Sequence, residues 1–178
     1  MATLFTHAFS AVVIHAGRLS KRKSFGVLLI GAISAALPDI DVITFSFGIP
    51  YGSMWGHRGF THSIFFAVIW SGFVALILRN IGWKISFYWT MGFLFLCTAS
   101  HGVLDAMTTG GKGVAFFAPW DTERYFLPWR WIKVSPIGIT NFKGEWAKAV
   151  LLSEFYLVWI PGLLFIFLRW ISAHLKWK

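Results

Sequence analysis

Long apolar segments constrain the fold of this chain more than any other feature of its sequence. Five are apparent, and they cover residues 4–17, 25–37, 63–78, 85–107 and 149–170. A membrane-spanning helix needs about 20 mainly apolar residues, and the bilayer core tolerates no unpaired backbone groups, so each segment is expected to be α-helical. The sequence therefore predicts one all-α domain over residues 1–178, an integral membrane bundle of four to five apolar helices.

Three regions qualify this prediction. The first segment is short enough to lie half-buried at the membrane surface, and the second can extend through an acidic pair to Phe47. Pro161 in the fifth segment is expected to kink it. Residues 108–146, between the last two helices, begin with a glycine-rich turn and are expected to form an interfacial loop or lid, because tryptophans favour the headgroup level. The tryptophans of this loop are Trp120, Trp129, Trp131 and Trp146.

The composition indicates a membrane protein rather than a nucleic-acid-binding one. Hydrophobic residues make up 57% of the chain and charged residues only 13%, far from a typical soluble domain. The formal net charge of +9 would suit nucleic acid, but the basic residues cluster between apolar segments and form no stripe with interleaved aromatics. No direct nucleic-acid binding is expected. The single cysteine, Cys97, lies in an apolar segment, and packing is its expected role.

The basic residues also indicate an orientation. If all five segments cross the bilayer, one face holds nine Lys and Arg residues and no acid: Arg18, Lys21, Arg22, Lys23, Arg79, Lys84, Arg169, Lys176 and Lys178. Cytoplasmic loops carry such an excess, so the N-terminus is expected on the other, non-cytoplasmic side. The first residues lack the basic region and cleavage site of a removable signal peptide, so the first helix is expected to stay.

Histidines and acids occur in four short motifs within this apolar sequence. The motifs are His7, the pair Asp39 and Asp41, the pair His57 and His62, and the pair His101 and Asp105. Ionisable groups at membrane depth are costly to bury and persist mainly where they pair, bind ions or do chemistry. Because consecutive helices joined by short loops run antiparallel, all four motifs fall at the same end of the bundle. A shared metal site on the non-cytoplasmic face is therefore the first hypothesis.

The spacing within two motifs limits their geometry. His101 and Asp105 lie about 40° apart on a helix, which suits two ligands, although an isolated salt bridge is the alternative. Asp39 and Asp41 would point about 200° apart on a regular helix, but Pro38 disfavours helical geometry before it. The pair is expected in an extended or turn stretch and facing one way, where a cation would relieve its repulsion. For one of the two, a helix cap is the alternative.

The third pair needs two different backbone environments. His57 and His62 are about 140° apart on a helix, so they cannot both be ligands from one helical face. His57 is expected in the preceding loop, where Gly56 and Gly59 permit a tight backbone. Arg58, between them, is always charged and fits an anionic substrate through two parallel hydrogen bonds.

The other histidines carry weaker signals. His7 alone would more often be an interfacial histidine than a ligand. His15, eight residues further on, lies about 80° away on a helix and beside the basic loop at the opposite face. His15 and His174 are expected to be structural or solvent-exposed.

The chemistry of the set favours a divalent transition metal. Imidazole nitrogens and carboxylate oxygens without thiolates suit zinc first, with manganese or iron as alternatives. The candidate ligands are His7, Asp39, Asp41, His57, His62, His101 and Asp105. Seven candidates exceed one tetrahedral shell. Either two ions bind, or some residues orient the ligands and one acid among Asp39, Asp41 and Asp105 is the general base.

The order and wording of these motifs resemble those of the LexA-binding, inner membrane-associated hydrolase family, also described as membrane-bound metal-dependent hydrolases. The resemblance extends as far as Pro136 and rests on Leu37-Pro-Asp-Ile-Asp-Val, His57-Arg-Gly-Phe-Thr-His-Ser, Ser100-His-Gly-Val-Leu-Asp and Thr108-Thr-Gly-Gly. It implies a multi-pass inner membrane protein with a metal-dependent hydrolase site. The family is similar to zinc-dependent phospholipase C and single-strand nucleases, all-helical enzymes that cleave phosphoesters at a multi-zinc site.

By position, the resemblance implies the same seven ligands and adds a second arginine. Arg124, in Pro119-Trp-Asp-Thr-Glu-Arg-Tyr-Phe, matches a family loop and is expected to contact the substrate together with Arg58. His15 matches no motif position. Many relatives have Asp-Pro shortly after this loop where this chain has Ser135-Pro136, a departure that bears on any further ligand from the loop.

Three functions compete at this point. The first is hydrolysis of a phosphoester, free or lipid-linked, by a metal-activated water. The second is a non-catalytic membrane regulator or scaffold, in which a structural metal stabilises the bundle and the loops bind a protein such as a repressor. The third is ion transport, which needs ionisable groups near mid-membrane and towards both faces. The predicted clustering at one end argues against the third.

Overall fold

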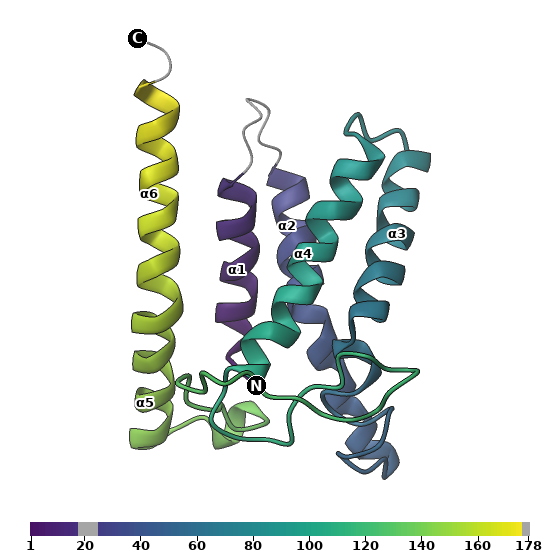
Figure 1. The fold of residues 1–178 in the computed structure, drawn as a ribbon, viewed down its shortest axis with the longest axis vertical. Coiled ribbons are helices and arrows are strands. Elements are labelled where there is room, and N and C mark those ends of the chain that lie inside the picture. Colours follow the sequence, from purple (N-terminus) through teal and green to yellow (C-terminus); the bar gives the residue numbers. More distant parts are fainter. Residues whose placement is uncertain (18–24, 176–178) are drawn as a thin grey trace.

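The computed structural model describes residues 1–17 and 25–175, apart from the side chain of Ile139. The part of the chain that it describes is helical, with isolated β-bridges only, which confirms the all-α prediction. The α-helices are α1 (Leu4–Ala16), α2 (Phe25–Ala36), α3 (Ile64–Asn80), α4 (Phe87–Ala106), α5 (Gly144–Glu154) and α6 (Ile160–Leu175) (Figure 1). The basic residues at positions 18–23, 176 and 178, which carry much of the orientation argument, lie outside the described residues.

Three helical stretches are long and apolar enough to cross a membrane. They are Phe25–Phe47, Phe87–Ala106 and Gly144–Leu175, and the shorter apolar helices Leu4–Ala16 and Ile64–Asn80 lie beside them. At 1.5 Å per residue, the 13 residues of α1 extend about 20 Å, which is less than the hydrocarbon thickness. The bundle therefore fits membrane insertion, with α1 too short to span the bilayer by itself.

Helix α4 is the centre of the bundle, because it packs against α1, α2 and α3. Small residues bring these helices close together: a Cβ atom on Gly31 of α2 would lie 2.6 Å from the ring of Phe93 on α4. Cys97 is completely buried in the same apolar cluster, which agrees with its expected packing role.

The acidic pair lies in a 3₁₀-helix that continues α2. Pro38 occupies its first turn, and the helix runs over Leu37–Phe47 until Gly48 ends it with a positive φ of 71°. The expected extended or turn stretch is therefore wrong. Proline lacks the backbone N–H donor but tolerates the first turn of a helix, so the chain changes its helical type instead of leaving the helix.

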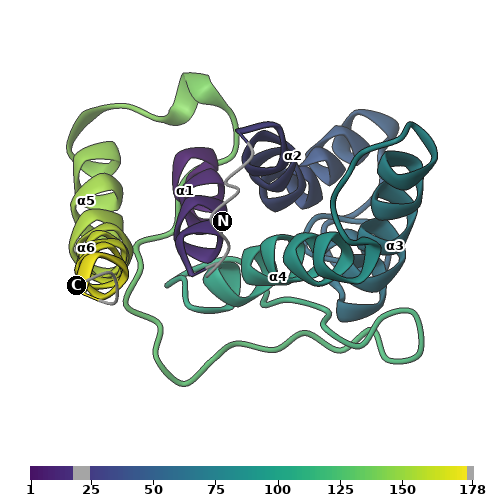
Figure 2. The same ribbon diagram turned by 90° about the horizontal axis from the view of Figure 1, so that it is seen from above.

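The last helix also differs from the prediction. A π-helical turn over Phe155–Trp159 joins α5 to α6, and Figures 1 and 2 show the two helices following one axis. The kink expected at Pro161 is not seen. The wider turn that precedes the proline accommodates its missing N–H within the continuing helix. The apolar helix also begins earlier than residue 149, at Gly144.

The loop between α4 and α5 crosses the lower end of the bundle in Figure 1 and passes along the side of α4 in Figure 2. Its tryptophans Trp120, Trp129 and Trp131 are exposed, as expected for side chains at headgroup level, and so is Trp146, which lies in the first turn of α5 and not in the loop. Isolated bridges pair Thr108 with Ile132 and Val114 with Tyr125, so the loop has defined internal contacts.

Candidate metal centre

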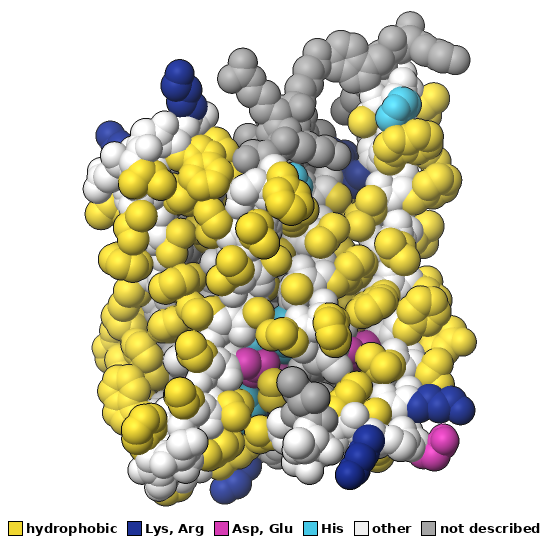
Figure 3. Space-filling model, turned by 180° about the vertical axis from the view of Figure 1, so that it is seen from behind, with side chains coloured by type: hydrophobic (Ala, Val, Ile, Leu, Met, Phe, Trp, Pro, Cys, Tyr) yellow, Lys and Arg dark blue, Asp and Glu magenta, His cyan; other side chains and the backbone are white. Residues whose placement is uncertain are grey.

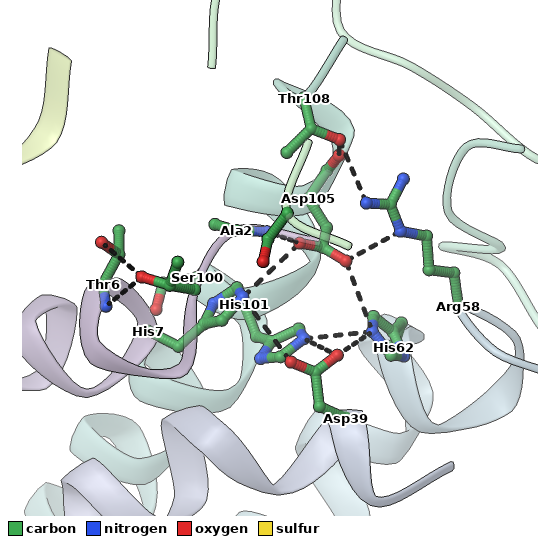
Figure 4. A network of polar contacts seen from close by, with 12 residues as sticks. Ala2, Thr6, His7, Asp39, Arg58, His62, Ser100, His101, Asp105 and Thr108 are labelled. Atoms are coloured by element: carbon green, nitrogen blue, oxygen red, sulfur yellow. Dashed lines mark hydrogen bonds and ion pairs between the residues drawn. The ribbon is translucent and has the colours of Figure 1, made fainter. Parts of the chain in front are cut away.

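All four sequence motifs meet at one end of the bundle. His7 comes from the start of α1, the two aspartates from the 3₁₀-helix after α2, and His101 and Asp105 from the end of α4. The third pair precedes α3. Figure 4 shows side chains from all four motifs pointing towards one another. The prediction that topology brings the motifs to one end is confirmed, and each of the seven side chains is at most 9% exposed.

Four donor atoms surround one point in this cluster. The Nε2 atoms of His62 and His101 are 3.1 Å apart, and Asp39 Oδ1 lies 3.3 Å from the His101 nitrogen and 3.7 Å from the His62 nitrogen. Asp105 Oδ2 lies 3.7 Å from the same His62 nitrogen. Four ligands bound at 2.0–2.1 Å in a tetrahedron are separated by about 3.3 Å. The spacing therefore fits a first-row transition metal, and these four residues could hold one ion.

The outer nitrogens of the two histidines indicate which tautomer each ring adopts. His101 Nδ1 is 2.7 Å from the carbonyl oxygen of Ala35, and His62 Nδ1 is 3.1 Å from Asp41 Oδ2. Both oxygens can only accept, so each Nδ1 donates a proton to its oxygen. The two Nε2 atoms then face each other at 3.1 Å, where their lone pairs repel unless a proton on one of them or a cation between them joins the two rings. This arrangement, with the second nitrogen held by a carboxylate or carbonyl, is usual for metal-binding histidines.

His7 extends the donor set. Its Nε2 is 3.5 Å from Asp105 Oδ1 and 3.9 Å from Asp39 Oδ2, and its ring stacks on that of His101 with centroids 3.6 Å apart. Neither nitrogen of His7 and neither carboxylate oxygen of Asp39 has a hydrogen-bond partner, although all four atoms are buried. Buried polar atoms without partners are rare in native proteins and indicate an unfilled interaction. The residues present therefore fit a bound cation.

Asp41 and His57 lie one step further out. Asp41 accepts hydrogen bonds from His57 Nδ1 at 2.7 Å, from Thr61 Oγ1 at 2.7 Å and from the backbone N–H of Arg58 at 3.1 Å. Asp41, His57 and His62 also have the proximity of a second ion site. Their separations at Asp41 are those of hydrogen bonds, however, so the structure favours a role in orienting His62. Asp39 thus approaches Nε2 of His62, and Asp41 approaches Nδ1 of the same ring. The prediction that the two carboxylates face one way is therefore wrong.

The two histidines of the third pair, His57 and His62, lie outside the membrane-spanning helices, and their pKa values are shifted in opposite directions. Burial lowers the pKa of His57 despite its hydrogen bond to Asp41. Burial also acts to lower the pKa of His62, but hydrogen bonds with Asp39 and Asp41 outweigh it and raise this pKa to about 9. The two carboxylates therefore favour a positive charge at the His62 ring, whether a proton or a metal ion supplies it.

The third motif has the tight backbone that the glycines predict. A Cβ atom on Gly56 would lie 2.2 Å from the carbonyl oxygen of Pro50, and one on Gly59 would lie 2.1 Å from that of Met54. His57 lies in these turns, as expected, while His62 ends a short 3₁₀-helix, Phe60–His62. Side chains larger than hydrogen at either glycine would displace the loop that carries His57.

Both arginines have protein partners. Arg58 is completely buried, with Nε 2.8 Å from Asp105 Oδ2, and it donates to Thr108 Oγ1 and the Gly110 carbonyl. Its φ of 63° is unusual for a residue with a side chain, so the surrounding contacts hold it in place. Arg124 donates to the carbonyls of His57, Tyr51 and Ser53. The structure gives both guanidinium groups a positioning role, and their contact with a substrate stays a prediction.

The remaining histidines lie outside the cluster. His15 is buried against the edge of the Phe93 ring, with centroids 5.7 Å apart, near the opposite end of α1. His174 is exposed in the last turn of α6 and contacts the Trp170 carbonyl. These positions agree with the structural and exposed roles expected for them.

Sequence analysis missed one buried acid. Glu154 is completely buried at the end of α5, where it accepts hydrogen bonds from the backbone N–H and hydroxyl of Thr3 and from the hydroxyl of Thr6. These bonds fix the start of α1, and thus the helix that carries His7, against the last helix. An acid within the apolar segment 149–170 was the available signal, and the two threonines that it binds are distant in sequence.

Comparisons with known proteins address the family and the location. A family model described as YdjM inner membrane protein matches residues 1–175. Inner membrane protein YbcI of Escherichia coli (strain K12) is 40% identical over 173 residues, which are 96% of this chain and 98% of the relative. No solved structure matches the chain. The inner-membrane part of the predicted resemblance is therefore confirmed.

Proposed function

We propose a function for the metal centre from the premise that this chain belongs to the YdjM inner membrane protein family. The proposed function is that of a metal-dependent hydrolase that cleaves a phosphoester. The observation that carries the proposal is the convergence of buried donor atoms at separations of metal ligands, with no hydrogen-bond partner at either nitrogen of His7 or either oxygen of Asp39. A site that only stabilised the bundle by ion pairing would leave fewer of these atoms unpaired.

A catalytic site keeps one position open. His62, His101 and Asp105 would then hold the ion with His7 beside them, and Asp39, the fourth residue of the group, would face the open position. Their donors are nitrogen and oxygen only, and the free cysteine is elsewhere in the apolar core, so zinc is the first choice and manganese or iron the alternatives. A bound divalent ion would lower the pKa of a water ligand and stabilise charge on the phosphoryl oxygens. One ion is the number that the geometry supports best, since the second ligand group shares His62 and is joined by hydrogen bonds.

Asp39 is the best candidate for the general base among the three acids. Asp41 is held by His57, Thr61 and the backbone, and Asp105 is paired with Arg58. Asp39 has no hydrogen-bond partner at either oxygen and is the most exposed of the seven site residues. Such an oxygen can accept a proton from an attacking water without first breaking another bond.

Positive charge beside the cluster favours an anionic substrate. Arg58 and Arg124 lie within or next to the site, and each guanidinium has five N–H groups, more than their protein contacts use. A phosphate drawn into the site could share these groups. The positive-inside rule favours the non-cytoplasmic face for this end of the bundle.

The experiment that tests the proposal is metal analysis followed by hydrolysis assays. Detergent-purified protein is expected to contain one transition metal ion per chain and, when loaded, to hydrolyse bis(4-nitrophenyl) phosphate or a phospholipid. His62→Ala is expected to lose both metal and activity, while Asp39→Asn keeps most of the metal and loses activity. Metal content that is unchanged in His62→Ala would contradict the proposal.

A second candidate function follows from the depth of the site. All seven side chains are at most 9% exposed and both arginines are engaged by protein groups, as in a closed structural site. In that case the metal stabilises a membrane regulator, and the aromatic loop binds a protein partner such as a repressor. Structural sites have four protein ligands, whereas catalytic sites keep an open position, so the number of bound waters distinguishes the two functions.

A further inference from the structure

An apolar cavity lies beside the metal centre, between the first two helices. It has a volume of about 430 Å³, within the 300–1,000 Å³ of typical ligand sites. Its wall on α1 consists of Phe5, Ala8, Phe9 and Val12, at the spacing of one helical face. His7 lies within this stretch of α1, between Phe5 and Ala8. We call this cavity the α1–α2 groove.

The second wall leads towards the acids of the site. It consists of Phe25, Leu28, Leu29 and Ala32 on α2, and Trp159 of the π-helical turn contributes from the last helix. One turn beyond Ala32 is Ala35, whose carbonyl oxygen holds His101. Asp39 follows in the 3₁₀-helix. The groove therefore runs along the bundle, and its lining on α2 ends about one helical turn before the residue whose carbonyl holds His101.

The site lies closest to the surface on the side where α2 lies. Figure 2 shows α2 on the far side of α4 from the viewer of Figure 1, so Figure 3 views the molecule from the α2 side. Apolar side chains cover the middle of that face, and acidic and histidine side chains appear between them in the lower half (Figure 3). Asp39, with 9% exposure, is the most accessible of the seven site residues.

We propose that the α1–α2 groove binds a hydrocarbon tail of a phosphorylated lipid, with the phosphate at the Asp39 side of the metal centre. This inference rests on the proposed function and names the class of its substrate. A tail alone gains little, because the surrounding bilayer is as apolar as the groove. Selection comes from the phosphate, which a bound cation and the guanidinium of Arg58 attract. An apolar groove near a cationic site matches a lipid that has both a hydrocarbon tail and a phosphate.

A second apolar cavity provides a matched control. It has a volume of about 550 Å³ and is lined by residues near the other end of α1 and by α4, including Ile14, Trp89 and Gly92. Nothing lies within 4 Å of a Cβ atom built on Gly92, so the first atom of the side chain in Gly92→Leu meets no neighbour. Ala8→Leu and Ala32→Leu add the same kind of side chain to the α1–α2 groove.

The first experiment measures binding without turnover, so it uses the Asp39→Asn variant, which is expected to keep the metal and lose activity. Phosphatidic acid with a diazirine in one acyl chain is photolysed with this metal-loaded variant in detergent, and adducts are mapped by peptide mass spectrometry. Diacylglycerol with the same chain is the comparison. We expect adducts on α1 and α2 at the groove, more with phosphatidic acid than with diacylglycerol. Ala8→Leu and Ala32→Leu are expected to reduce them about tenfold or more, as for extra methylene groups in an apolar pocket, and Gly92→Leu to leave them unchanged.

The second experiment separates this inference from the proposed function. In the metal-loaded protein, Ala8→Leu should reduce hydrolysis of long-chain phosphatidic acid but leave hydrolysis of bis(4-nitrophenyl) phosphate unchanged. Adducts spread evenly over all lipid-facing helices, or equal labelling by the two lipids, would overturn the inference even if the soluble ester is hydrolysed. Labelling specific to the groove and to phosphatidic acid, without hydrolysis of either ester, would support the groove and refute the hydrolase.

Discussion

The two ends of α1 each carry a buried histidine, yet only one belongs to a site. His7 is fully buried and faces Asp39, Asp105 and the stacked ring of His101. His15, 6% exposed, contacts the edge of the Phe93 ring within the apolar part of the bundle. Burial of a histidine is therefore not what defines the metal centre. Donors that reach one point from several helices define it.

The same contrast applies to the two ends of the bundle. At the lower end in Figure 1, the interior contains carboxylates, imidazoles and a fully buried arginine. Further up, it contains Leu94, Cys97 and other apolar side chains. Buried charges cost more than they stabilise unless they are paired well, so the lower end has a composition that stability alone does not explain. Function is the simplest reason for that cost.

Removal of a metal donor should have the largest effect and separate the two histidine environments. His101→Ala is expected to weaken metal binding by a factor of about a hundred to several thousand, because the roughly 10–16 kcal/mol of a typical zinc site is shared among three or four ligands. His15→Ala is expected to keep its metal. The measurement is metal per chain after dialysis, with helical content checked by circular dichroism. Equal metal content in the two variants would remove the distinction between the ends.

Loss of the buried guanidinium group of Arg58 should have the next largest effect. Arg58→Met leaves Asp105 without its nearest positive partner and is expected to destabilise the protein by about 3–5 kcal/mol. Arg79→Met is the control, since Arg79 lies in the last turn of α3 at the other end of the bundle. Denaturant unfolding in detergent measures both. A change below about 1 kcal/mol in Arg58→Met, as for a surface pair, would show that the pair contributes little.

Asp41→Asn tests the residue that orients His62. We expect metal affinity to fall about 10–100-fold, since partners of metal-binding histidines typically contribute this much. Titration with zinc in the presence of a competing chelator gives the affinity. Asp121→Asn, in the exposed part of the long loop, should leave it unchanged. If both variants bind zinc as tightly as the wild type, Asp41 has no part in holding the ion.

Glu154→Gln should have the smallest effect of the four. The amide replaces one of two acceptor oxygens that bind Thr3 and Thr6, and an unsatisfied buried donor costs about 1–3 kcal/mol. Glu145→Gln is the matched control, because its pair with Lys148 is exposed and contributes at most about 1 kcal/mol. The thermal midpoint in detergent should fall for Glu154→Gln only. An equal fall in both variants would argue against a special role for the buried acid.

Much of the fold and of the site could be predicted, because hydropathy and motif order act over short distances. Apolar runs predicted the helices, and their alternating direction predicted that His7, Asp39, His62 and Asp105 meet. The 3₁₀-helix after Pro38 and the π-helical turn before Pro161 could not be predicted, since either proline also permits a break. The groups that hold His101 and Arg58 could not be predicted either, because they lie far from these residues in the sequence.

Those partners are groups that no local pattern singles out. The carbonyl of Ala35 belongs to an apolar residue, yet it sets the tautomer of His101. Thr108 and Gly110 hold Arg58 from 50 or more residues away. Sequence identified the arginine as charged and available to an anion, and only the packed structure assigns it to Asp105.

X-ray absorption at the metal edge of the purified, metal-loaded protein tests the central claim most directly. The account predicts one ion per chain with nitrogen and oxygen neighbours at about 2.0–2.1 Å, imidazole scattering beyond them and no sulfur at about 2.3 Å. The imidazole signal should weaken in His101→Ala and stay in His15→Ala. Absence of a stoichiometric ion, or a sulfur neighbour, would contradict the claim that the histidines and aspartates at this end form a metal centre.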